Sequence, residues 1–449
     1  MIAETKDKSI QRQSRMATLW NKGTEATEVV DRFTVGKDRE LDLRLAAYDI
    51  EGSKAHIKML ESIGLLTADE LDVLTAGLDR ILAQVKAGRF VLEDDVEDIH
   101  SQVELQLTRE LGELGGKIHA GRSRNDQVLV DLKLFLRDEL KQVREEILTL
   151  FGTLQTLSER FKDVLLPGYT HTQLAMPSSF GMWLGAYAEA LADDMQGLQA
   201  AYRVVNRNPL GSAAGYGSSF PLDRAMTTRL LDFDTPVYNS VAAQLGRGKC
   251  ELAVASALAG VALTLNKFAV DCIFGMSPGQ GFIHFPDELT TGSSIMPHKK
   301  NPDVWEILRG RCNRILACPN EIAMLNSNLQ HGYHRDFQLL KEILFPALEQ
   351  IHECLQMADY MIRHMDVNTH IFDDPRYELL FTVEEVNRRT LAGTPFRDAY
   401  RQVGIEVNQG QFHYAVPAQA SELGHTHLGS LGNLCTKQIA AVMEKTAAW

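Results

Sequence analysis

The sequence predicts an all-α protein built around a central bundle of long helices. Three observations carry this prediction. Apolar residues recur every three or four positions from Leu129 to Phe161, which keeps one stripe on one helix face. Two further stretches, 182–205 and 250–274, are rich in Ala, Leu and Gly and carry few charges, as helices buried on most sides do. No run of alternating β-branched residues is long enough for a sheet, apart from a short ribbon expected near 408–416.

The expected helices follow in chain order. Thr67 and Glu70 have the spacing of a capping box, so a helix is predicted to begin after Thr67 and to end near Gly88. A helix over 129–161 would span about 50 Å at ~1.5 Å per residue, which is typical of a bundle. Its expected buried stripe consists of Leu129, Leu132, Leu136, Leu140, Val143, Ile147, Leu150, Leu154, Leu157 and Phe161.

Changes of composition near residues 115–121 and 371–375 predict three domains. These are an N-terminal helical domain (1–121), a central long-helix bundle (122–371) and a small C-terminal helical domain (372–449). Glycine and proline concentrate between the long helices, in segments where we expect loops and function: 167–177, 209–221 and 275–302.

The composition is that of a globular protein with an acidic balance. Apolar residues make up 45% of the chain and charged residues 23%, which excludes a disordered chain. The net charge of −13 at pH 7 argues against nucleic acid or an anionic membrane as a partner. An acidic net charge does not exclude an anionic substrate, because a binding site can be locally basic.

The cysteines and the N-terminus indicate a soluble, cytoplasmic protein. The six cysteines form no CxxC pair, so we expect neither a disulfide framework nor a zinc site. The first residues lack the apolar segment of a secretory signal. The longest mostly apolar stretch, 252–265, is too short to span a bilayer.

The strongest chemical signal is the segment from Gly292 to Pro302, which reads Gly-Ser-Ser-Ile-Met-Pro-His-Lys-Lys-Asn-Pro. Its Gly and Pro residues favour a defined loop. Its two Lys supply positive charge for carboxylates or phosphates, and its Asn adds directional hydrogen bonds. The spacing is not that of a phosphate-binding loop. The segment resembles the signature of the fumarase/aspartase superfamily, whose members eliminate fumarate from a succinyl-bearing substrate.

Three further motifs narrow the resemblance to the argininosuccinate lyases. Residues 121–127 read Gly-Arg-Ser-Arg-Asn-Asp-Gln and follow Asp-Ile-His at 98–100, and residues 168–173 read Gly-Tyr-Thr-His-Thr-Gln. The third motif is the spacing of Tyr333, Gln338 and Lys341. The resemblance implies a fumarase/aspartase-like three-domain subunit in a homotetramer, with each site combining loops from three chains. It implies a small-molecule substrate, arginine biosynthesis, and no cofactor or metal ion.

The resemblance also implies the catalytic residues. Ser293 would be the general base that removes a proton next to a carboxylate, with Lys299 and loop N–H groups stabilising its alkoxide. His171 would help to protonate the departing guanidinium, and Glu306 would orient this imidazole and raise its pKa. Lys299 and Asn301 would hold the carboxylate that stabilises the carbanion.

Substrate binding is implied for two further sets of residues. Arg124, Asn125 and Thr170 would hold the succinyl carboxylates. The α-amino and α-carboxyl groups of the arginine half would contact Tyr333, Gln338 and Lys341. Two readings stay open for His100, which either supports the region around Arg124 or is a structural histidine with satisfied hydrogen bonds.

The chain departs from the family pattern at three places. After Asn239-Ser240, the segment 241–249 lacks the usual acidic cluster and has gained a Lys. If this segment lines the pocket for the amine half, the arginine half is either recognised differently or carries a modification, for instance N-acylation. Gln330 stands where a proline is usual, and the N-terminal motif is reduced at 19–23.

Three alternatives compete with an argininosuccinate lyase. One is adenylosuccinate lyase or an aspartase-like enzyme, against which the motif at 121–127 argues. Another is a structural or storage protein on the same scaffold, and a third is an anion-binding module without turnover. His425 and His427 give only a weak metal signal, because two His without a nearby Cys or carboxylate are a poor ligand set.

Overall fold

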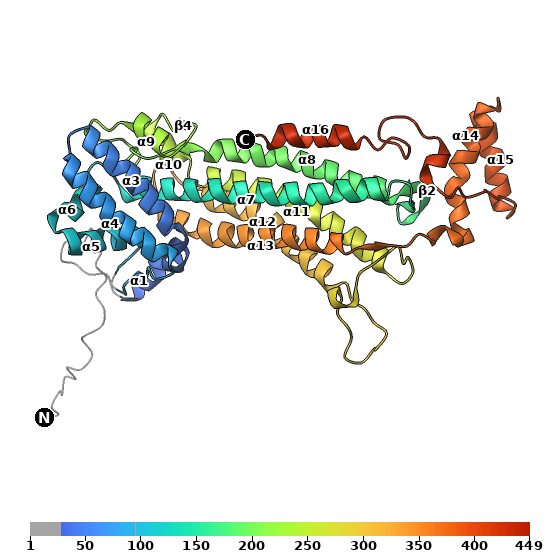
Figure 1. Ribbon diagram of the computed structural model, residues 1–449, viewed down its shortest axis with the longest axis horizontal. Helices are drawn as coiled ribbons and strands as arrows, with labels where there is room; N and C mark the ends of the chain where they lie inside the picture. Colours follow the sequence, from blue (N-terminus) through green and yellow to red (C-terminus); the bar gives the residue numbers. More distant parts are fainter. Residues whose placement is uncertain (1–27, 95) are drawn as a thin grey trace. The chain divides into compact units, whose positions relative to one another are not determined.

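The computed structural model describes residues 28–94 and 96–449, and most of them are helical (Figure 1). The chain falls into two compact units. The first contains the described residues up to Lys141 together with 200–255 and 318–348, and the second contains 142–199, 256–317 and 349–449. The three domains predicted with boundaries at 121 and 371 stay a prediction. The segments at 1–15 and 19–23 lie outside the described residues.

The first unit contains mainly short and medium helices, and α3, α4 and α5 pack on one another. Its elements are α1 (Glu28–Val35), α2 (Asp38–Asp42), η1 (Leu43–Leu45), α3 (Ala46–Ser62), α4 (Ala68–Lys86), α5 (Ile99–Leu111), α6 (Glu113–Gly116), η2 (Lys117–His119), β3 (Arg207–Asn208), α9 (Arg224–Leu230), β4 (Thr235–Pro236), α10 (Ser240–Leu245) and η4 (Arg335–Gln338). The capping box at α4 is confirmed, because Thr67 accepts from the Glu70 N–H and Glu70 accepts from the Thr67 N–H (2.9 Å).

The second unit contains the hairpin β1–β2 and the C-terminal helices, of which α14 packs on α15. Its elements are β1 (Leu165–Thr170), β2 (Gln173–Ser179), β5 (Ile283–His284), η3 (Asp287–Leu289), β6 (Asp366–Val367), η5 (Ile371–Asp373), η6 (Pro375–Phe381), α14 (Thr382–Leu391), α15 (Phe396–Asn408), η7 (Ala420–Leu423) and α16 (Thr436–Ala447). Five longer helices have residues in both units: α7 (Arg124–Arg160), α8 (Phe180–Val205), α11 (Lys249–Met276), α12 (Asp303–Asn326) and α13 (Leu339–Arg363).

The long helices predicted from the apolar pattern are confirmed. α7 covers 37 residues, and every member of its predicted stripe is buried. Within the second unit, side-chain hydrogen bonds join these helices to one another. Thr153 of α7 donates to Asp359 of α13 (2.6 Å), Thr264 of α11 donates to Asp194 of α8 (2.6 Å), and Asn266 of α11 donates to Asn313 of α12 (2.9 Å). The all-α bundle is therefore the observed architecture.

Two local predictions are wrong. The segment 167–177 is a β-hairpin rather than a loop, with Pro167 opposite Pro177, where a two-stranded ribbon tolerates residues that donate no hydrogen bond. The expected ribbon at 408–416 contains no strand. Phe412 instead packs in a cluster with Val386 and Val403, and Tyr414 packs against this cluster. The apolar side chains of this segment therefore make contacts with helices and not with a second strand.

α11 is longer than the apolar stretch expected within it, because the helix continues to Met276. By length and composition alone it could cross a membrane, and half of its most apolar window is buried within the protein. Leu263, Val270 and Phe274 are nevertheless 48%, 43% and 39% exposed. α11 therefore leaves apolar side chains open to solvent in the single chain.

Candidate active site

The residues expected to act on a substrate fall into two groups, one in each unit. The first unit contains Arg124, Asn125, Tyr333, Gln338 and Lys341. The second unit contains Thr170, His171, Ser293, Lys299, Asn301 and Glu306.

The motif at 121–127 forms the start of α7. The Asp126 carboxylate accepts from the backbone N–H of Ser123 and, with its other oxygen, from those of Gly211 and Ala213, each at 2.9 Å. Gly121 has a φ of +71°, and a Cβ there would lie 2.9 Å from a methyl carbon of Leu222. The hydrogen bonds of Asp126 thus hold the start of α7 against the loop that follows β3. Arg124 and Asn125 lie in the first turn of α7.

Arg124 is held between two acidic residues that precede α5. Its guanidinium lies 2.9 Å from Glu97 and 2.5 Å from Asp98. Burial opposes the charge on this guanidinium, but Asp98 and Glu97 outweigh that effect and raise its pKa. Glu97 also binds Arg335 of η4 at 2.6 Å. Arg124, which is expected to hold a carboxylate of the substrate, is therefore oriented by two acidic side chains of the protein.

Gln338 and Lys341 come from η4 and the start of α13. Lys341 is 3% exposed and forms ion pairs with Asp42 and, at 2.6 Å, with Asp38. Burial disfavours the ammonium, but Asp42 and Asp38 outweigh it and raise the pKa of Lys341. Gln338 donates to the second oxygen of Asp38 at 2.5 Å. Lys341 is thus a buried cation held by two carboxylates.

One polar pocket gathers all five expected residues of the first unit. It is lined by Asp38, Arg124, Asn125, Val128, Arg247, Tyr333, Gln338 and Lys341. Sequence reasoning missed Asp38 and Arg247. Asp38 stands in a run of alternating charges at 37–40 that reads as a solvated surface, and Arg247 stands in the segment that departs from the family pattern.

The departing segment 241–249 contributes to this pocket through Arg247 alone. Arg247 is 2% exposed, whereas the unusual Lys249 is exposed to solvent. Asn239 caps α10 by accepting from the N–H groups of Val241 and Ala242. A Cβ at Gly248, whose φ is +74°, would lie 2.5 Å from the side chain of Asn326. Close packing at this glycine therefore fixes the chain immediately after Arg247.

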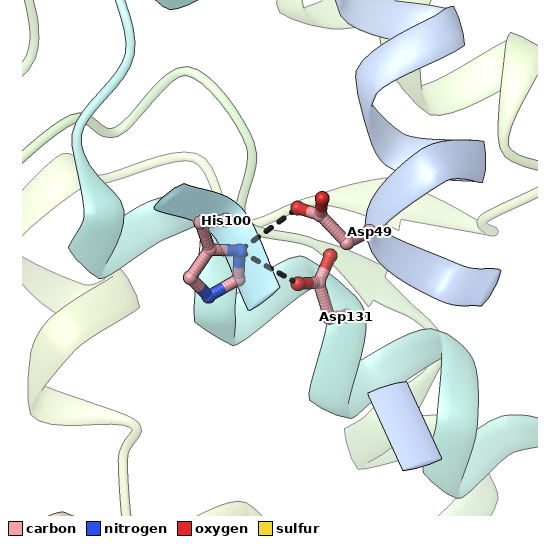
Figure 2. Close-up of side chains that lie close together, drawn as sticks. All are labelled: Asp49, His100 and Asp131. Carbon is pink, nitrogen blue, oxygen red and sulfur yellow. Dashed lines mark hydrogen bonds and ion pairs between the residues drawn. The ribbon is translucent and has the colours of Figure 1, made fainter. Parts of the chain in front are cut away.

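His100 lies in a buried cluster with Asp49 of α3 and Asp131 of α7 (Figure 2). Its Nδ1 is 2.9 Å from Asp49 and 3.6 Å from Asp131. Burial disfavours the imidazolium, but Asp49 outweighs it and raises the pKa of His100. Gln127 also donates to Asp49 at 2.7 Å, which links the cluster to the motif at 121–127.

The same three side chains are a ligand set that divalent metals accept. Two features disfavour a cation here. Nδ1, the ring nitrogen facing both carboxylates, is already engaged with Asp49, and the positive charges of Arg122 and Lys341 act on Asp131. Burial and the charge of Asp49 raise the pKa of Asp131 well above its ordinary value. The cluster therefore resembles a structural ion pair that supports the start of α7.

In the second unit, the segment 292–302 is a loop, as expected. Its base is closed by an antiparallel bridge between Thr291 and Asn301, and the Asn301 amide donates to the Gly292 carbonyl (3.3 Å). Ser293 Oγ accepts from the backbone N–H groups of Met296 (3.1 Å) and Ile295 (3.4 Å). Lys300 pairs with Asp287, while Lys299 is exposed. The Ser293 hydroxyl thus faces donors that would stabilise its alkoxide.

His171 occupies the turn of the hairpin β1–β2, and Thr170 ends β1. His171 and Thr172 have φ values of +54° and +60°, a left-handed conformation that non-glycine residues rarely adopt. Glu306 lies in the first turn of α12, beside the buried Trp305. Both His171 and Glu306 are exposed, and the described chain gives their side chains no hydrogen bond or ion pair. Their predicted pairing is therefore not made within the second unit.

The sequence matches the model of a protein family described as Lyase over residues 24–317. An argininosuccinate lyase from Parabacteroides distasonis is 58% identical over 95% of this chain and 94% of its own length. One from Bacteroides thetaiotaomicron is 56% identical over 95% of each chain. A third, from Thermotoga neapolitana, is 40% identical over 86% of this chain and 97% of its own.

Solved structures with the same fold are more distant in sequence. EDDS lyase in complex with formate superposes with a TM-score of 0.73 at 22% identity, covering 95% of this chain and 92% of its own. The class II fumarase from Schistosoma mansoni has a TM-score of 0.70 at 18% identity, covering 91% and 90%. These similarities concern the arrangement of the helices.

Proposed function

The chain belongs to the argininosuccinate lyase family, and we propose that it catalyses the reversible elimination of fumarate from argininosuccinate, which releases arginine. The single observation that carries the proposal is the pocket of the first unit. It brings together Arg124 and Asn125 from one motif and Tyr333, Gln338 and Lys341 from another that lies far away in the sequence. The pocket offers cations and hydrogen-bond donors to a substrate that carries three carboxylates.

We propose Ser293 as the general base. The reaction removes a weakly acidic proton from the carbon next to a carboxylate, and a serine hydroxyl does so only if its alkoxide is stabilised. The two backbone N–H groups that point at Ser293 Oγ support this role. Lys299, on the same loop, would hold the carboxylate on which negative charge develops.

His171 and Glu306 are proposed to act on the leaving group. As the bond between the succinyl carbon and the guanidinium nitrogen breaks, that nitrogen takes a proton, which His171 would help to supply. A carboxylate at hydrogen-bond distance would fix the tautomer of this imidazole and raise its pKa. Since each side chain is exposed and unpaired in the described chain, we propose that they meet across a subunit interface.

A homotetramer with shared sites is supported by the exposed apolar side chains of the long helices. Leu263 and Val270 of α11, Ile307 and Met324 of α12, and Met357 of α13 are each at least 42% exposed. Apolar surface of this kind on bundle helices is typical of a face that other subunits cover.

Shared sites have a direct test. Ser293→Ala and His171→Asn, each inactive alone, are mixed, unfolded and refolded together. Hybrid tetramers should regain fumarate release if Ser293 and His171 of one site come from different chains. Mixtures that stay as inactive as the single variants would contradict shared sites. The two variants refolded separately and then mixed serve as the control.

The proposed setting is the cytoplasm, with no nucleic acid or membrane partner. The net charge of −13 disfavours both polyanions. The one helix of the described chain that is apolar enough to span a membrane, α11, is buried over half of its most apolar window and donates a hydrogen bond to α8. Cell fractionation checks this directly, because protein recovered only in the membrane pellet would contradict it.

The activity is tested by following fumarate through its ultraviolet absorbance. Purified protein is supplied in parallel with argininosuccinate, adenylosuccinate and aspartate. We expect release from argininosuccinate alone. Release from adenylosuccinate or aspartate instead would assign another member of the superfamily, and no release from any of the three would favour a structural or merely anion-binding relative.

A further inference from the structure

The pocket of the first unit contains one carboxylate among its cations. Of the residues that line it, Arg124, Arg247 and Lys341 are basic and Asp38 alone is acidic. Asp38 is 6% exposed, so its charge was removed from water when the chain folded. A buried carboxylate at a binding surface is costly unless it is paired, which raises the question of what it binds.

Lys341 does not fully neutralise Asp38. The Lys341 ammonium also pairs with Asp42, which does not line the pocket, so this trio has one more carboxylate than ammonium. Asp38 uses one oxygen for Lys341 and the other for the Gln338 amide, and a carboxylate accepts about four hydrogen bonds. The carbonyl oxygen of Gln338 is buried and accepts no hydrogen bond from residues 28–94 or 96–449. Acceptors therefore remain for a cation.

Arg247 supplies a donor on the same pocket. Its guanidinium lies over the Phe337 ring at 5.3 Å and 3.4 Å from the Glu251 carboxylate. Its Nη1 is buried and has no hydrogen-bond partner among the residues that the structure describes. A buried donor of this kind is costly unless a ligand or water accepts from it. The pocket thus offers free acceptors at Asp38 and Gln338 and a free donor at Arg247, the complement of an amino-acid zwitterion.

We propose that Asp38 determines specificity by binding the free α-ammonium group of the arginine half of argininosuccinate, while Arg247 binds the α-carboxylate. This inference rests on the proposed lyase activity and identifies which form of the substrate the site selects. Asp38 supplies the negative charge that the segment 241–249 lacks. Acylation of the α-nitrogen would remove the positive charge and leave the Asp38 carboxylate facing a neutral, bulkier amide.

The alternative is that Asp38 only positions Lys341. The two roles differ in their effect on a substrate without the ammonium group. Asp38→Asn is isosteric and removes the charge, and it is assayed with argininosuccinate and with its Nα-acetyl derivative. We expect the KM for argininosuccinate to rise on the order of 10- to 100-fold with a smaller change in kcat, as loss of a charge-assisted hydrogen bond predicts. The preference for argininosuccinate over the acetyl derivative should shrink by a similar factor.

Asn125→Ala is the matched control, because Asn125 lines the same pocket and is expected to contact the succinyl half, which both substrates share. It should weaken both substrates alike and leave the preference unchanged. If Asp38→Asn also leaves the preference unchanged, Asp38 is a positioning residue and the proposal is overturned.

A second measurement uses the unaltered protein, so that the test of the proposal does not depend on whether the Asp38 variant folds. Product inhibition by arginine is compared with inhibition by 5-guanidinopentanoate, which lacks only the α-amino group. Arginine should inhibit on the order of tenfold or more tightly, and equal inhibition would refute the role of Asp38. Absence of fumarate release by the unaltered protein would instead refute the proposed function, so the two failures are distinguishable.

Discussion

Replacing His56 by glutamine should flatten the dependence of stability on pH in the acid range. His56 of α3 is fully buried, and its Nε2 lies 2.9 Å from the carbonyl oxygen of Ala120, the residue before the motif at 121–127. Burial and the nearby charge of Arg122 lower the pKa of His56 from 6.5 to about 3. A glutamine amide can still donate to Ala120 but does not titrate.

The magnitude follows from the difference between the folded and unfolded pKa values. Between pH 6.5 and about 3 the unfolded chain binds a proton at His56 that the folded chain does not bind. The free energy of unfolding therefore falls as the pH falls below 6.5, by about 1.4 kcal/mol per pH unit from this residue. Near pH 5 the loss amounts to ~2 kcal/mol relative to neutral pH.

The assay is denaturant unfolding of both proteins at a fixed protein concentration, at several pH values from about 5 to 7.5. The stability of the parent relative to His56→Gln should decline by ~2 kcal/mol as the pH falls from neutral to about 5. Other titrating groups, including His100 with its raised pKa, are common to both proteins and cancel in the difference. Parallel stability profiles would refute the buried, neutral state of His56.

Two further predictions concern catalysis and folding. Ser293→Ala should lower kcat by about 10²–10⁴, as removal of a general base does, while substrate binding measured by calorimetry survives; turnover within about tenfold of the parent would exclude Ser293 as the base. Thr67→Ala should reduce the free energy of unfolding by ~1 kcal/mol through loss of the capping box and leave fumarate release unchanged, whereas an unaltered denaturation midpoint would show that the cap contributes nothing.

Features that depend on local periodicity and local hydrogen bonds were predictable from the sequence. The stripe from Leu129 to Phe161 specifies one face of α7 because a helix repeats every 3.6 residues whatever its surroundings. The Thr67 capping box involves residues three apart, so its spacing alone identifies it. The motif at 292–302 is rich enough in Gly and Pro to predict a loop.

Features that depend on distant partners were not predictable in this way. The proline-containing segment 167–177 becomes a hairpin because each strand pairs with the other, which no single strand's pattern shows. Phe412 and Tyr414 have strand-like spacing, but Phe412 is buried in a cluster with side chains of α14 and α15, and Tyr414 packs against this cluster.

The candidate site also has features that the local sequence predicts and features that depend on distant partners. The sequence alone predicted the candidate motifs, because residue type and spacing within a short segment are properties of the chain. Only the tertiary structure showed that Asp38 and Arg247 share a pocket with Lys341. The charges of Asp38 and Arg247 point to a ligand because both side chains are buried. On a solvated surface water and salt would screen these charges, whereas in a desolvated pocket an unsatisfied acceptor and donor indicate a ligand. Burial is decided by the whole fold, not by the residues next to Asp38 in the chain.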